Sequence, residues 1–125
     1  MIGNYDIFDK SKLLRPEHDV VLMVFNMGGT LLSFITAMCK GWGWGGDFGC
    51  FYFWASLDPY DQTLEEPFEG VRFETDHPLQ VTISYDDAYY YMKLAYPKYV
   101  QRHPESEQEL LDLFKEYRQR YNIQE

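Results

Sequence analysis

The sequence predicts an α+β domain with a helical N-terminal half, a small antiparallel sheet of about three strands and two C-terminal helices packed on it. Residues 71–75 and 80–85 alternate apolar and polar side chains around the turn sequence Asp76-His77-Pro78, which is typical of an antiparallel hairpin. Beyond the hairpin, apolar residues recur at helical spacing almost to the end of the chain. A length of 125 residues indicates a single domain, residues 1–125.

The N-terminal half holds one clear helix and one ambiguous apolar run. Residues 31–40 place apolar side chains on one helical face, with Thr30 positioned to cap the helix and Gly41 to end it. Residues 19–26 fit either a strand, because valines favour one, or a buried helix, because the run is uniformly apolar.

Residues 20–39 together approach the length and hydropathy of a membrane span. A small membrane-associated protein is therefore an alternative reading of this chain. Asn26 and the pair Gly28-Gly29 interrupt the run, its upstream flank is acidic at Glu17 and Asp19, and neither end carries a basic cluster. These features count against insertion. The N-terminus also lacks the features of a secretory signal, so we expect a cytoplasmic protein.

The middle of the chain is rich in glycine, tryptophan and carboxylates. Five glycines among residues 41–49 predict a structured loop without regular elements, followed by a short strand over 50–54 and an acidic loop over 56–67. Trp42 and Trp44 either plug the edge of the sheet or form an exposed anchor. A loop of this kind could also serve a non-catalytic small-ligand-binding module as a stacking platform.

Two helices are predicted after the hairpin. Ser84 and Asp87 form an S-x-x-D start signal for a helix that reaches about residue 102, with a kink or break near Leu94 because Pro97 falls inside it. Pro104 begins the last helix, whose first turns are acidic and whose last turns are basic.

The net charge of the chain is concentrated in one segment. Residues 41–92 hold ten carboxylates and a single cation, Arg72, whereas the other 73 residues balance to zero. Such a distribution attracts a cationic partner and opposes direct binding to nucleic acid. The carboxylates alternate with aromatic residues, as they do in protein-binding surfaces.

No catalytic or metal-binding pattern emerges from the sequence. The run Asn26-Met27-Gly28-Gly29-Thr30 resembles the D-x-D-G-T motif of haloacid-dehalogenase phosphatases but lacks both carboxylates. The three histidines are scattered, and Cys39 and Cys50, expected to be free thiols although a disulfide is conceivable, have no C-x-x-C spacing. We therefore predict a protein that is not an enzyme and needs no cofactor or metal.

Several segments follow one another in an order that resembles a known family. These are a W-G-W segment at 42–44, a Cys-aromatic strand at 50–53, F-E-G-V-R-F at 68–73, V-T-I-S at 81–84 and the Y-x-x-x-H-P-E step at 99–105. In this order they resemble the immunity proteins of bacterial contact-dependent growth inhibition (CDI), in particular the group paired with ribonuclease toxins. The resemblance covers about two thirds of the chain, and the long Gly/Trp loop and Pro97 depart from the family pattern.

The resemblance implies a cytoplasmic protein that binds the nuclease domain of one cognate toxin and covers its active site. A nuclease cleft is basic because it holds a polyanion, so the acidic segment is the expected contact surface. Contact residues differ between pairs of such a family, and our candidates therefore rest on charge and expected exposure. The predicted partner-binding residues are Asp58, Tyr60, Asp61, Glu65, Glu66 and Glu69, together with Asp47 and Trp44.

Overall fold

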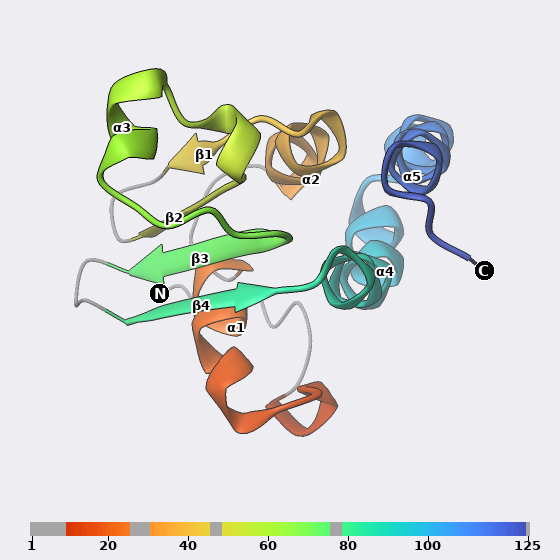
Figure 1. The fold of residues 1–125 in the computed structure, drawn as a ribbon. Helices are drawn as coiled ribbons and strands as arrows, with labels where there is room; N and C mark the ends of the chain where they lie inside the picture. The colour runs from red at the N-terminus through yellow and green to blue at the C-terminus, as the bar shows by residue number, and fades with distance from the viewer. Residues whose placement is uncertain (1–9, 26–30, 46–48, 76–78, 125) are drawn as a thin grey trace.

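The computed structural model of the chain describes residues 10–25, 31–45, 49–75 and 79–124. Its centre is an antiparallel sheet of four strands in the order β1-β2-β3-β4 (Figure 1). The strands are β1 (Trp44–Gly45), β2 (Gly49–Tyr52), β3 (Val71–Thr75) and β4 (Gln80–Ile83). The predicted pairing of the two hairpin strands is confirmed. The second strand ends at Ile83 rather than at residue 85, because Ser84 caps the helix that begins at Tyr85. The turn at 76–78 lies outside the described residues.

The sheet has one strand more than the three that the sequence predicts. The additional strand, β1, lies in the glycine-rich segment that was expected to contain no regular element, and it pairs Trp44 with Phe51. The Trp44 ring stacks on Phe51 at 6.0 Å and meets Phe34 edge-on at 5.0 Å. This aromatic packing holds the segment against β2, and it outweighs the low strand propensity of the glycines.

Two helices cover one face of the sheet. The ambiguous run at 19–26 forms a helix, α1 (Asp19–Phe25), and the predicted helix at 31–40 is confirmed as α2 (Leu31–Lys40). The Phe25 ring lies 4.6 Å from Phe34 of α2 and 6.3 Å from Phe73 of β3, so both helices share one core with the sheet. The Thr30 cap lies outside the described residues.

The N-terminal segment is attached to the C-terminal half through a buried tyrosine. Tyr91 accepts a hydrogen bond from the backbone N–H of Leu14 at 2.8 Å, and its hydroxyl lies 2.7 Å from Nδ1 of the buried His18. Because the Tyr91 proton can be donated to Nδ1, this geometry fits a neutral imidazole.

The last two helices are α4 (Tyr85–Arg102) and α5 (Glu107–Tyr121), which lie beside one end of the sheet (Figure 1). Ser84 caps α4 as predicted, accepting a hydrogen bond from the N–H of Asp87 at 3.0 Å. The predicted break near Leu94 is wrong, since α4 continues through Pro97. Ala95 and Val100 pack on the core on either side of the proline, and this packing outweighs the lost backbone hydrogen bond.

Candidate functional site

The polar face of the sheet carries the acidic segment. Register pairs Tyr52 with Arg72 and Cys50 with Glu74, and these side chains point away from the face that Phe51 and Phe73 bury. Residues 53–70, which connect β2 to β3, return over this polar face and supply most of the predicted site residues.

Arg72 is the main anchor of this connection. Its Nη1 lies 2.6 Å from Oε1 of Glu65, its Nε donates to the Thr82 hydroxyl at 2.8 Å, and its guanidinium sits 3.9 Å from the centre of the Phe68 ring. The single cation of the acidic segment is therefore already engaged within the chain. Of the predicted site residues, Glu65 is the one that it neutralises.

Tyr52 extends the Arg72 cluster. Its hydroxyl donates to Glu74 and lies 3.4 Å from Oε2 of Glu65. Burial, followed by the hydrogen bond to the Glu74 carboxylate, raises the pKa of Tyr52 well above its usual range. The phenol stays protonated and joins two carboxylates that would otherwise repel each other.

The acidic loop contains a short helix that the sequence analysis missed, α3 (Pro59–Thr63). Asp58 caps it by accepting a hydrogen bond from the N–H of Asp61 at 2.8 Å, and Pro59 occupies its first turn. Gln62 binds the carbonyl of Trp54 at 3.0 Å and so fixes which side of α3 faces the protein. The dipeptide Asp58-Pro59 could have predicted the start of this helix, because it combines a capping side chain with a proline at the first helical position.

Five of the eight predicted site residues lie exposed on this connection. They are Asp58, Tyr60, Asp61, Glu66 and Glu69. In the described part of the chain, the carboxylates of Asp61, Glu66 and Glu69 form no hydrogen bond or ion pair, whereas Asp58 is used as a cap. We call these five residues the acidic surface.

The other three predicted residues have different surroundings. Glu65 is half-buried in its ion pair with Arg72, and Trp44 packs on Phe34 and Phe51 as the plug of the sheet edge. Asp47 lies outside the described residues. The exposed member of the tryptophan pair is Trp42.

Sequence reasoning also missed Leu64, which directly follows α3 and is 65 % exposed. Its position four residues after Tyr60 could have indicated that the two side chains lie close together. Residues four apart share one side of a helix, and here that side is opposite Gln62.

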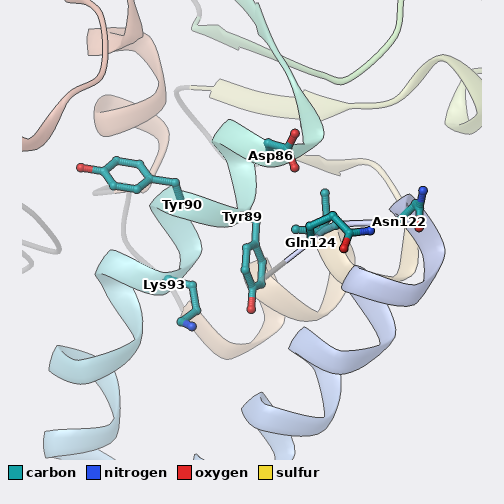
Figure 2. Close-up of a pocket in the computed structure, with 7 residues that line it drawn as sticks. Asp86, Tyr89, Tyr90, Lys93, Asn122 and Gln124 are labelled. Atoms are coloured by element: carbon teal, nitrogen blue, oxygen red, sulfur yellow. The ribbon is translucent and has the colours of Figure 1, made fainter.

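Apart from the acidic surface, a concave region lies between α4 and the C-terminal residues (Figure 2). This open groove has a volume of about 520 Å³ and is lined by Asp86, Tyr89, Tyr90, Lys93, Asn122, Ile123 and Gln124. Figure 2 shows that its charged side chains, Asp86 and Lys93, extend from α4 at different levels of the groove. The Lys93 ammonium lies 5.4 Å from the centre of the Tyr89 ring, which gives it an aromatic partner within the fold.

The thiols and the metal-ligating side chains form no second site in the described residues. Cys39 and Cys50 are free thiols, and burial raises the pKa of Cys39 to about 12, which makes it a poor nucleophile. No group of three or more His, Cys, Asp or Glu side chains within the described ranges is arranged to hold a metal ion.

The apolar run at 20–39 is divided between α1 and α2 in the fold. Among the helices described, none combines the length and the apolarity needed to cross a bilayer.

Comparison with known proteins gives one match. No curated protein and no solved structure matches the chain. The model of a protein family described as CDI immunity protein matches residues 17–114, which include both helices of the N-terminal part, the whole sheet and the acidic surface. The chain therefore belongs to the CDI immunity protein family.

Proposed function

We propose that this protein neutralises the nuclease domain of a cognate toxin, a ribonuclease, by seating the acidic surface in the basic active-site cleft of that domain. In this role it acts in the cytoplasm, performs no catalysis and needs no cofactor. The observation that carries the proposal is the exposure of the carboxylates of Asp61, Glu66 and Glu69, which pair with no other described residue, beside the capping carboxylate of Asp58.

Electrostatics support a basic cleft as the target. An active site that holds RNA presents lysine and arginine side chains to phosphates, and an acidic protein surface is complementary to it. Carboxylates that pair with no cation among the described residues are available to those lysine and arginine side chains. Membership of the CDI immunity family supports a toxin as the partner, and the charge pattern supports a basic nuclease domain as the part of the toxin that is bound.

The ion pair with Arg72 decides which carboxylates can test the proposal. Changing Glu65 would break its ion pair with Arg72, which anchors the loop, as well as alter the charge of the surface. Glu66 and Glu69 are exposed and unpaired in the described structure, so their reversal changes charge alone.

The experiment begins with the tagged protein and lysate from a strain that carries its native gene neighbourhood. A pull-down at low and moderate salt is expected to recover one stoichiometric basic toxin domain that lacks ribonuclease activity in the complex and regains it when released. Recovery of a toxin domain without nuclease activity would contradict the proposed ribonuclease target.

The contact surface is tested with Glu66→Lys/Glu69→Lys, which is expected to slow association about tenfold or more at low salt, with a smaller effect as salt rises. The matched control is Glu17→Lys/Glu109→Lys, because it makes the same change of net charge at exposed residues outside the acidic surface. Equal effects of the two double variants would show that net charge alone matters, and the acidic surface would no longer be the proposed contact.

A further inference from the structure

We infer that Tyr60 and Leu64 form an apolar anchor of the toxin interface, docking on an apolar patch of the cognate toxin domain that lysine and arginine side chains border. This inference rests on the proposed function and deepens it, because it assigns the site of tight contact to Tyr60 of the acidic surface and to Leu64 beside it.

The exposure of these two side chains is the first argument. Tyr60 is 70 % exposed and Leu64 is 65 % exposed, the highest values among the large apolar side chains of the described residues. They are four residues apart and therefore neighbours on one side of the α3 turn. Tyrosine in particular is enriched at the centres of protein interfaces, since it offers a large apolar ring with a polar tip.

The rigidity of α3 is the second argument. The helix has no buried residue, so burial does not hold it in place. Polar contacts hold it instead: the Asp58 cap, the Gln62 hydrogen bond to the Trp54 carbonyl, and a hydrogen bond of 2.6 Å from the Thr63 hydroxyl to the carbonyl of Tyr60. A loop that is preorganised in this way loses little conformational entropy on binding, and its exposed apolar pair is presented in a fixed geometry.

The charges around Tyr60 and Leu64 indicate which kind of partner docks there. Asp58 and Asp61 flank Tyr60 along the chain, and the exposed Glu66 follows Leu64 after one intervening residue. An apolar centre inside a rim of carboxylates matches a partner patch whose own apolar centre is bordered by cations. The proposed nuclease cleft provides such cations, and a second copy of this acidic surface would be repelled.

The test uses the purified C-terminal domain of the toxin encoded immediately upstream of the immunity gene as the probe, with binding kinetics measured on immobilised protein. Tyr60→Ala and Leu64→Ala are each expected to raise Kd about tenfold or more, mainly through faster dissociation. Met23→Ala in α1 and Leu111→Ala in α5 are matched controls, because they truncate exposed apolar side chains outside the connection. All four variants are expected to unfold at the wild-type temperature.

The outcomes separate this inference from the proposed function. If Tyr60→Ala and Leu64→Ala bind within twofold of the wild type while Glu66→Lys/Glu69→Lys binds much more weakly, the apolar anchor is overturned and the acidic contact stands. If the wild-type protein does not bind the toxin domain, both are overturned. Loss of binding in the Met23 or Leu111 variant, with the α3 variants unaffected, would move the interface to another part of the surface.

Discussion

Arg72 and Glu65 form an ion pair of 2.6 Å that ties the connection after α3 to the polar face of the sheet. The same guanidinium stacks on Phe68, so one side chain holds the loop through a carboxylate and a ring. The pair removes one carboxylate from the surface available to a partner and fixes the position of its neighbours. Its main role in this fold is therefore to position the acidic surface.

Replacing the cation tests this role. Arg72→Ala is expected to lower the free energy of unfolding by about 1–3 kcal/mol, because it removes the stacking contact and leaves the half-buried Glu65 without its cation. Glu66→Gln is the control, with an expected change of about 0.5 kcal/mol or less at an exposed position. Urea unfolding followed by circular dichroism measures both variants, and equal stability of the two would argue against the anchor.

The two neighbouring tryptophans are expected to differ sharply in their contribution to stability. Trp44→Ala should cost about 2–4 kcal/mol, because it removes the ring that packs on Phe34 and Phe51 and joins β1 to the core. Trp42→Ala should change stability by about 0.5 kcal/mol or less, because that side chain is exposed. Chemical denaturation of the two variants makes the comparison, and a larger cost at Trp42 would contradict the assignment of Trp44 as the ring that packs on the core.

His18 should make the stability depend on pH. Its pKa is lowered from 6.5, chiefly by desolvation on burial, while Asp87 and Glu17 partly oppose the shift. Because the folded state binds the proton more weakly than the unfolded chain, this contribution to stability is present above pH 6.5 and is lost as the pH falls through the folded pKa. The free energy of unfolding should therefore fall between about pH 7.5 and about pH 5.5.

A histidine variant locates the effect. His18→Gln removes the imidazole beside Tyr91 and should flatten the pH dependence across this range. Urea unfolding of the wild type and the variant at a series of pH values provides the measurement, and the same slope in both proteins would exclude His18 as the source.

Gly70 is expected to be intolerant of a side chain. Its φ of +101° is unfavourable for other residues, and an added Cβ would lie 2.1 Å from the carbonyl oxygen of Ile83 in β4. Gly70→Ala should therefore cost about 3 kcal/mol or more, because a backbone atom cannot move aside without disturbing the β3–β4 pairing.

Gly45→Ala is the control for this substitution. Its added Cβ would meet its nearest neighbour, the Cβ of Cys50, at 3.9 Å, which is an ordinary contact. Its cost is expected to be about 1 kcal/mol or less. The yield of folded protein and its urea midpoint measure both variants, and a Gly70 variant as stable as the Gly45 variant would contradict the steric argument.

Much of the local structure could be predicted from the sequence. The S-x-x-D signal at Ser84 correctly placed the start of α4, and the alternation in 71–75 and 80–85 correctly predicted the pair β3 and β4, although β4 ends two residues earlier, at Ile83. Each of these features depends on side chains and backbone groups that are close together along the chain. The order of motifs from Gly41 onward also correctly indicated the family.

Other features depended on partners that are distant in the sequence. Residues 19–25 form a helix and Trp44 enters a strand because the core formed by α2 and the sheet accepts their side chains in those conformations. Pro97 stays within a helix because the residues on both sides of it pack on that core. Propensity alone could not weigh these contacts.

The acidic segment, residues 41–92, shows most clearly what the sequence determined and what the tertiary structure decided. By itself, the sequence determined that ten carboxylates and one cation lie in residues 41–92, because composition and order need no folding. Only the tertiary structure decided that Arg72 neutralises Glu65 and that Asp58 caps a helix. It also decided that Asp61, Glu66 and Glu69 find no ion-pair partner among the residues described. The physical reason is that the strength of an ion pair depends on the distance between the two charges in space. The pairing of β2 with β3 brings the connection between them back over the sheet, and the sequence alone does not give the resulting distances between side chains.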